Sequence, residues 1–525
     1  MPKVLIADAL SPRAAEILVA RGIEVDFSPG LAIDELEARI ADCDGLAVRS
    51  ATKVTAGLIG RAAKLKVIGR AGIGIDNIDA DAATQRGIVV MNTPYGNSIT
   101  DAEHTIAMLF ALCREIPAAD RSTQAGKWEK SRFMGVELTG KTLGLIGCGN
   151  VGSIVAERAL ALRMKVIAYD PFLSPERAVD LGIEKLSLDA LFARADFITL
   201  HTPLTNATKN LIDGRAIAKM RRGVRLVNCA RGGLVVEGDL AAALDSGRVA
   251  GAAIDVFVDE PARENPLFGR DNVVATPHLG AATTEAQENV ALQIAEQMAD
   301  FLLTGAISNA VNVPSLTAEE AKRLSPYMKL AEQLGSFAGQ LTETGITAVA
   351  VEYEGAAAEL NFKPLTAIAL TGLLSPQLAA VNMVNAPVIC REREIRVSET
   401  RRAEPVDYQT LIRVIVTTER RTREVAGTLF AGDKPRIVSV EGIPLEAELG
   451  GNMLFVRNYD KPGFIGALGN ALGAANVNIA TFHLGRTAPG HDAIALVEVD
   501  QPLTAGVLDT VRLLPNVIQV KALRF

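Results

Sequence analysis

Residues 141–152 read KTLGLIGCGNVG, and this stretch decides the fold of the middle of the chain. The apolar run LGLI predicts a buried strand, and Gly147, Gly149 and Gly152 predict a tight turn that leads directly into a helix. Further strand-like runs follow at VIAYD, DFITLHTP, GVRLVNCA, VAGAAIDVF and NVVATPHL. Strands that alternate with helical segments favour parallel βαβ units, so residues 99–282 are predicted to form an α/β domain.

The glycine spacing is the one that a dinucleotide-binding turn needs. The first glycine makes the turn, the second lets the backbone approach a pyrophosphate, and the third lets the helix pack closely on the strand. Asp170 ends the next strand, where a carboxylate accepts hydrogen bonds from ribose hydroxyls and repels a 2′-phosphate. The motif therefore predicts NAD rather than NADP. The residues expected to bind it are Gly147, Gly149, Asn150, Val151, Gly152 and Asp170.

The flanking sequence predicts a second, discontinuous α/β domain. Before residue 100, the strand-like runs KVLIAD, GLAVR, KVIGRAG and GIVVMN alternate with helical segments. Long helices are expected at residues 99–118 and 284–303, on either side of the NAD-binding domain. This arrangement predicts an insertion. Residues 1–98 plus 283–313 would form a Rossmann-like substrate-binding domain, and residues 99–282 would form the inserted Rossmann NAD-binding domain.

The last 210 or so residues follow a different pattern. Residues 314–447 mix helices with strands such as LIRVIVTTE and predict a separate α+β intervening domain. Residues 452–525 read in the order βαββαβ, which is the ferredoxin-like arrangement. At about 100–200 residues per domain, the total of 525 residues agrees with three or four domains.

Composition excludes several classes of function. Lys and Arg number 54 against 61 Asp and Glu, so the net charge of −7 gives no general attraction for nucleic acid or anionic membranes. Residues 364–390 carry no charge, but prolines and amides interrupt the run, so we expect buried soluble structure and no membrane span. The five cysteines form no CxxC pair, which predicts a cytoplasmic protein without a metal site. The first residues also lack the apolar region of a signal peptide.

Three polar residues follow predicted strands of the NAD-binding domain. Arg231 follows LVNCA, Glu260 follows DVFVD, and His278 follows NVVA. The carboxyl ends of parallel strands are where open α/β sheets hold ligands. Nicotinamide chemistry on a hydroxyl needs a proton-transfer group and a cation that orients the substrate. Since a nearby carboxylate raises the pKa of histidine and fixes its tautomer, we predict His278, Glu260 and Arg231 as the catalytic set.

Taken in order, the motifs GCGNVG, Asp170, NCARGG, DVFVDEP and TPHLGA resemble those of the D-isomer-specific 2-hydroxyacid dehydrogenase family. The resemblance implies that Arg231 binds the substrate carboxylate and carbonyl, that His278 is the general acid and base, and that Glu260 orients it. It also implies a set of residues that line the cofactor, with Asp255 near the carboxamide: Thr202, Cys229, Ala230, Asp255 and Gly280.

The length and the C-terminal module resemble the long members of this family. They imply oxidation of 3-phospho-D-glycerate to 3-phosphohydroxypyruvate, the first step of the phosphorylated route to L-serine. Guanidinium groups suit a phosphate, so Arg49, with Ser50 beside it, and Arg70 are expected to bind the substrate, and the resemblance implies that Asn97 contacts it too. Residues 452–525 resemble an ACT domain, which implies a homotetramer and an L-serine effector site where two such domains pair, at Asn458, Asp460 and Asn478.

Several alternatives stay open at this point. The chain could act on another 2-hydroxy acid, as a hydroxypyruvate or glyoxylate reductase does, or it could be a nucleotide-sensing binding protein on the same fold. Arg49 and Arg70 could be interdomain salt-bridge partners. The ACT-like module could hold subunits together without binding an effector.

Overall fold

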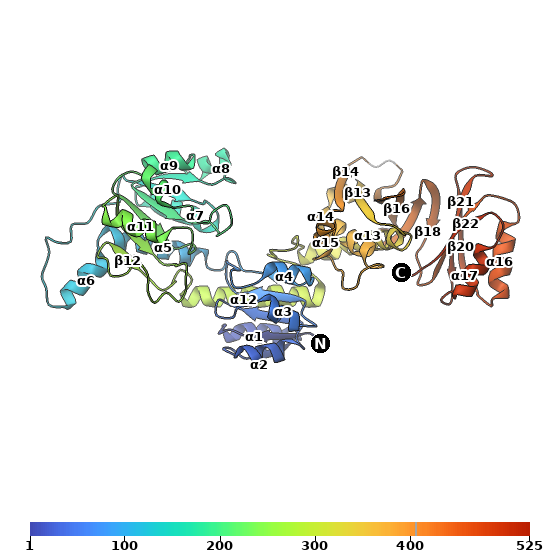
Figure 1. Cartoon of the computed structure of the whole chain (residues 1–525), viewed down its shortest axis with the longest axis horizontal. Coiled ribbons are helices and arrows are strands. Elements are labelled where there is room, and N and C mark those ends of the chain that lie inside the picture. The colour runs from blue at the N-terminus through green and yellow to red at the C-terminus, as the bar shows by residue number, and fades with distance from the viewer. Residues whose placement is uncertain (405–406) are drawn as a thin grey trace.

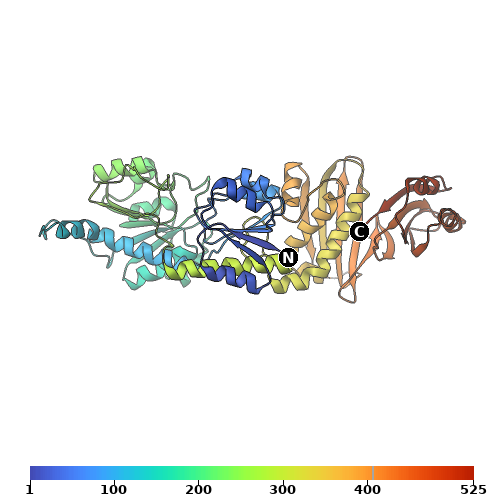
Figure 2. The same cartoon turned by 90° about the horizontal axis from the view of Figure 1, so that it is seen from below.

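The computed structural model describes residues 1–404 and 407–525, and its strands form four sheets that lie in a row along an elongated molecule (Figure 1). In Figure 2 the long helix α12 (Thr284–Thr304) runs from the second-sheet unit along the first sheet. The N-terminus lies in the middle of this row, because the first sheet lies between the second sheet and the third.

The first sheet has five parallel strands in the order β2-β1-β3-β4-β5. Helix α12 packs on it so closely that a Cβ at Gly69 would lie 2.3 Å from Sδ of Met298. Residues near 300 thus complete the core of a unit formed by the first residues of the chain. The elements are β1 (Lys3–Ile6), α1 (Pro12–Ala20), β2 (Glu24–Phe27), α2 (Ile33–Ile40), β3 (Gly45–Val48), α3 (Ala56–Arg61), β4 (Val67–Arg70), α4 (Ala80–Gln85) and β5 (Val89–Met91).

The second sheet has seven parallel strands in the order β12-β11-β10-β9-β6-β7-β8, which confirms the predicted α/β class with Rossmann-like sheets. The order reverses between β6 and β9, and ligands of open α/β sheets bind at such a switch point. The elements are β6 (Thr142–Ile146), α7 (Asn150–Ala161), β7 (Lys165–Tyr169), α8 (Pro175–Asp180), β8 (Glu184–Lys185), α9 (Leu188–Arg194), β9 (Phe197–Leu200), α10 (Gly214–Lys219), β10 (Val224–Asn228), α11 (Glu237–Asp245), β11 (Val249–Ile254) and β12 (Val273–Ala275).

The expected single helix at residues 99–118 is wrong. The structure has α5 (Ser98–Cys113) and α6 (Ile116–Gln124), separated at Glu115, whose φ of 55° is left-handed. Pro117 gives the physical reason, since it has no N–H to continue the helical hydrogen bonds and its ring favours the first turn of a new helix. The second long helix agrees with the prediction to within a residue or so at its ends.

The third sheet is mixed and has the order β14-β13-β15-β16-β17-β18. The uncharged stretch at residues 364–390 contributes to α14 and α15, and none of the described helices is long and apolar enough to cross a membrane. Of the predicted domain 314–447, residues 405 and 406 lie outside the described residues. The elements are α13 (Ala318–Gln340), β13 (Ile346–Gly355), α14 (Phe362–Leu374), α15 (Ala386–Glu392), β14 (Arg396–Arg402), β15 (Thr410–Thr418), β16 (Thr422–Phe430), β17 (Lys434–Val440) and β18 (Ile443–Ala447), with a 3₁₀ turn at Ala356–Glu359.

The fourth sheet is antiparallel, with the order β20-β21-β19-β22 and two helices on one side. Its element order along the chain is βαββαβ. The domain boundaries drawn from the sequence, and the identification of this module as an ACT domain, stay predictions. The elements are β19 (Met453–Tyr459), α16 (Phe464–Ala474), β20 (Ile479–Arg486), β21 (Asp492–Val499), α17 (Ala505–Arg512) and β22 (Val517–Leu523).

Candidate active site

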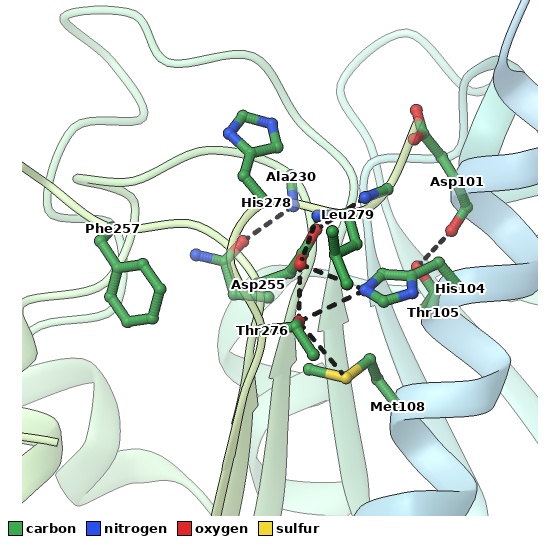
Figure 3. Close-up of polar contacts among 12 residues, drawn as sticks. Asp101, His104, Thr105, Met108, Ala230, Asp255, Phe257, Thr276, His278 and Leu279 are labelled. Atoms are coloured by element: carbon green, nitrogen blue, oxygen red, sulfur yellow. Dashed lines mark hydrogen bonds and ion pairs between the residues drawn. The ribbon is translucent and has the colours of Figure 1, made fainter. Parts of the chain in front are cut away.

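A fully buried carboxylate organises the loop after β12 (Figure 3). Asp255 accepts hydrogen bonds from the Thr276 hydroxyl at 2.6 Å and from the backbone N–H groups of Leu279 and Gly280 at 2.8 and 2.9 Å. Nε2 of His104, on α5, lies 3.2 Å from the same carboxylate. These bonds hold the pKa of Asp255 below its usual value although burial opposes them. The expected contact of Asp255 with the cofactor stays a prediction.

The loop that Asp255 holds carries His278. Nδ1 of His278 lies 2.7 Å from Oε2 of Glu260, and the other oxygen of Glu260 accepts from the backbone N–H of Phe257. The hydrogen bond to Glu260 raises the pKa of His278, and burial opposes this only in part. The pKa of Glu260 is lowered despite its burial, because it accepts these bonds. Nδ1 is thus committed to Glu260, which leaves Nε2 of a half-exposed ring to exchange a proton with a ligand.

Arg231 lies on the loop after β10, at the same edge of the sheet. Its backbone carbonyl accepts from the side-chain amide of Asn228 at 2.9 Å, and Nη1 donates to the carbonyl of Ala230 at 2.6 Å. Nε donates to Asp76 at 2.8 Å, and Asp76 belongs to the loop after β4 in the first sheet. His278 follows β12 at this edge too, and the charge of Arg231 opposes protonation of His278.

The other expected substrate-binding residues lie on the first-sheet side. Arg70 ends β4, and its Nε is buried without a hydrogen-bond partner among the described residues. Burial, together with the charges of Arg231 and Arg49, lowers the pKa of Arg70 to about 10. Arg49 follows β3, and its backbone N–H donates to Asp8 at 2.6 Å. Three arginines therefore surround one region, although Ser50 beside Arg49 is exposed.

Asp101 was not found from the sequence. It lies in the first turn of α5, where its Oδ2 accepts from the side-chain amide of Asn97 at 3.0 Å. Burial raises its pKa to about 6, the nearby Asp255 adds to this, and Arg231 and His278 oppose it. A Cβ at Gly280 would lie 2.7 Å from Asp101 Oδ1, so the carboxylate covers the His278 loop. The sequence offered one signal for this contact. Asn97 and Asp101 are four residues apart, and residues at this spacing are neighbours on a helix.

The glycine-rich turn has the shape that a pyrophosphate site requires. A Cβ at Gly147, whose φ is 92°, would lie 2.3 Å from the carbonyl oxygen of His201, and a Cβ at Gly152 would lie 2.2 Å from that of Gly147. At Gly149 the space around a Cβ is open, because no atom lies within 4 Å. Only the middle glycine thus faces free space, at the start of α7, where backbone N–H groups favour an anion. The residues present fit a dinucleotide.

The remaining expected cofactor residues lie around this turn and the neighbouring strand ends. Asp170 accepts from the backbone N–H groups of Cys148 and Phe172, both at 2.7 Å, so its carboxylate is fixed beside the glycine-rich turn, and its contact with a ribose stays a prediction. The side-chain amide of Asn150 donates to the carbonyl of Pro94 at 3.2 Å. Burial raises the pKa of the Cys229 thiol, which keeps it neutral. Thr202, after β9, and Ala230, after β10, are partly exposed at the same edge, and Val151 lies in the first turn of α7.

Within one chain, the expected effector residues do not come together. Asn458 lies opposite Ala493 in the fourth sheet, whereas Asn478 precedes Ile479, which lies opposite Val499 at the far end of β21. Asp460 accepts from Arg486 at 2.7 Å near the first of these ends. The amide oxygen of Asn458 is buried without a partner among the described residues. The three residues therefore do not form one site within a single chain, and their role as effector residues stays a prediction.

Comparison with known proteins gives the family. Residues 106–280 match the model for the NAD-binding domain of D-isomer-specific 2-hydroxyacid dehydrogenases, and residues 323–441 match the D-3-phosphoglycerate dehydrogenase intervening domain. The D-3-phosphoglycerate dehydrogenase of Synechocystis sp. is 44% identical over 97% of this chain and 92% of its own length. The enzyme of that name from Bacillus subtilis is 40% identical over 99% of both chains.

Solved structures of dehydrogenases match part of this chain. The D-lactate dehydrogenase of Aquifex aeolicus, in complex with NAD and lactic acid, is 29% identical and covers 59% of this chain and 100% of its own, with a TM-score of 0.53. This agreement supports the NAD-binding fold of the first part of the chain.

Proposed function

The chain belongs to the family of D-isomer-specific 2-hydroxyacid dehydrogenases, and on this premise we propose that it oxidises the C2 hydroxyl of 3-phospho-D-glycerate to 3-phosphohydroxypyruvate with NAD. The observation that carries the proposal is the 2.7 Å pair of His278 and Glu260, which shares a site with Arg231. A proton-transfer group beside a carboxylate-binding cation is what oxidation of a 2-hydroxy acid needs.

NAD, which the glycine-rich turn at the start of α7 and Asp170 would hold, would supply the acceptor for the hydride of C2. His278 takes the hydroxyl proton at Nε2, since its Nδ1 is held by Glu260. The positive charge that forms on the imidazole is stabilised by Glu260, whose pKa lies below its usual value, so that it stays ionised near neutral pH. The guanidinium of Arg231 binds the substrate carboxylate as a planar fork and polarises the carbonyl that develops at C2. In the reverse direction the same groups return the proton.

The phosphate of the proposed substrate would be bound by Arg49 and Arg70. Even with its pKa lowered to about 10, Arg70 is a cation at neutral pH, and its buried Nε has no partner among the described residues. A buried cation without a hydrogen-bonded partner is costly unless a ligand anion supplies one. Asn97, which is buried next to Asp101, is proposed to contact the substrate through its backbone or its amide.

The direct test is NADH formation at 340 nm with 3-phosphoglycerate and NAD, together with NADH consumption by phosphohydroxypyruvate. Hydroxypyruvate and glyoxylate should be much poorer substrates, because neither carries a phosphate for Arg49 and Arg70. Equal turnover of glyoxylate and phosphohydroxypyruvate would favour the alternative assignment as a glyoxylate or hydroxypyruvate reductase. NAD should support the reaction and NADP should not, since Asp170 repels a 2′-phosphate.

We also propose that the fourth sheet is an ACT regulatory domain that binds L-serine between two chains of a cytoplasmic homotetramer. The support is the βαββαβ order of this sheet, together with the placement of Asn458 and Asn478 near opposite ends of β21, which keeps the two side chains from sharing one small ligand within a chain. Adding L-serine to the assay tests the effector, and Asn478→Ala should remove the inhibition while leaving uninhibited turnover intact. Indifference of the wild-type enzyme to L-serine would leave the module with a purely structural role.

A further inference from the structure

Asp76 contacts Arg231 from the opposite side of the site. Nε of Arg231 donates to Oδ2 of Asp76 at 2.8 Å, and the two residues lie on loops that follow strands of different sheets. Gly74 also packs tightly against both side chains. A Cβ at this position would lie 1.9 Å from Nη2 of Arg231 and 2.7 Å from Oδ2 of Asp76. The loop of residues 72–79 therefore forms a seat for the guanidinium, and this seat exists only because residue 74 has no side chain.

The loop itself is fixed independently of Arg231. The side-chain amide of Asn77 donates to the carbonyls of Arg49 and Thr52, each at 2.7 Å. The backbone of Val54 accepts from the N–H of Asp79 and donates to the carbonyl of Asn77. These bonds flank Asp76 and fix its position within the first-sheet unit through contacts that do not involve the second-sheet unit.

The hydrogen bonds of Arg231 leave N–H donors free on its two outer nitrogens, Nη1 and Nη2. A guanidinium has five N–H donors. Asp76 takes the one on Nε, and the carbonyl of Ala230 takes one on Nη1. One donor on Nη1 and both on Nη2 remain, which is enough for a bidentate bond to a carboxylate. The acid that holds Arg231 thus does not occupy the edge of the guanidinium that would bind substrate.

We propose that Asp76 is a positioning residue, which fixes the plane of the Arg231 guanidinium across the two units so that its outer nitrogens face the substrate carboxylate. The inference rests on the proposed function only in requiring a 2-hydroxy acid as substrate, and it does not depend on the phosphate. The opposing view is that Asp76 competes with the substrate for Arg231. The two views predict changes of opposite sign when Asp76 is removed.

The test compares Asp76→Asn, Asp76→Ala and Gly74→Ala with the wild-type enzyme. Positioning predicts a rise in the KM for the 2-hydroxy acid or 2-oxo acid of about 10- to 100-fold, the usual value of a hydrogen bond to a charged group. Asn, which keeps an acceptor, should do less damage than Ala. Gly74→Ala should act in the same direction, because its methyl group displaces the guanidinium. The Kd for NADH, measured by fluorescence, should change less than twofold in all three variants.

A matched control is Asp42→Asn, which breaks the exposed 2.8 Å pair of Asp42 and Lys64 on the same unit, far from Arg231. It should leave the KM unchanged. In an Arg231→Lys background, Asp76→Asn should add less than a twofold effect, because the group that it orients is gone. A KM that stays constant or falls in Asp76→Asn would overturn the proposal. If wild type fails with 3-phosphoglycerate, the proposed function is wrong, and the same ratios are then measured with the 2-hydroxy acid that it does oxidise.

Discussion

Nδ1 of His278 lies 2.7 Å from Oε2 of Glu260, while the backbone N–H of His278 donates to the carbonyl of Asp255. The first bond sets the tautomer and the charge of the ring, and the second holds the backbone of the loop. His278 adopts a left-handed φ of 54°, which few residues other than glycine favour, so this placement is maintained by its surroundings.

Replacement of His278 by Ala removes the group that exchanges the substrate proton. We expect turnover to fall by roughly two to four decades, the usual contribution of general acid and base catalysis. The Kd for NADH should stay close to that of wild type, since no residue of the glycine-rich turn is changed. Steady-state kinetics and NADH fluorescence measure the two quantities. A variant that keeps most of its turnover would remove His278 from the mechanism.

Glu260→Gln should move the pH profile. The bond to Glu260 raises the pKa of His278, so its loss lowers that pKa. Oxidation requires the neutral imidazole, and its rate rises with pH through the pKa, so this limb should move to lower pH in the variant. Reduction requires the imidazolium, so its rate falls as pH rises through the pKa. In the variant this fall should begin at a lower pH than in wild type. The kcat/KM profiles in both directions test this, and an unchanged limb would show that His278 is not the titrating group.

Asp101→Asn should change how stability depends on pH. Burial raises the pKa of Asp101 from its usual 3.8 to about 6. The folded state therefore holds a proton that the unfolded state releases, and this contribution to stability is lost as pH rises from about 4 through 6. The Tm of Asp101→Asn relative to wild type should thus increase over that window.

The matched control for this measurement is Glu103→Gln, which alters an exposed acid on the same helix. Its Tm relative to wild type should show no rise between pH 4 and 6. An equal pH dependence in both variants would mean that Asp101 ionises normally.

Gly149→Ala and Gly152→Ala should have different effects, the first on the binding of NADH and the second on the stability of the fold. A Cβ at Gly149 meets no atom within 4 Å, so this variant should keep its stability to within about 0.5 kcal/mol. Its Kd for NADH should rise about tenfold or more, because the methyl group lies where the backbone approaches the pyrophosphate. A Cβ at Gly152 would lie 2.2 Å from a carbonyl oxygen, so that variant should lose stability or solubility instead. Thermal unfolding and NADH titration distinguish the two outcomes.

Local patterns predicted the second sheet well because each signal there lies within a few residues. The strand before Gly147 and the acid Asp170 after the next strand define one βαβ unit. The break at Glu115 was missed, since the apolar stripe continues past it and only Pro117 marks the new helix. Asp101 was missed because its importance comes from Gly280 and Asp255, which lie more than 150 residues away in the chain.

The sequence by itself determined the α/β class and the glycine-rich turn, and it placed His278, Glu260 and Arg231 after strands as candidate catalytic residues, because these features depend on short-range periodicity and on residue chemistry at strand ends. Only the tertiary structure decided that Arg231 would be held by Asp76 from another sheet and that Asp255 would be enclosed beneath the His278 loop. Such contacts form when separate units pack together, and the direction and burial of a side chain there are set by neighbours that no local pattern specifies.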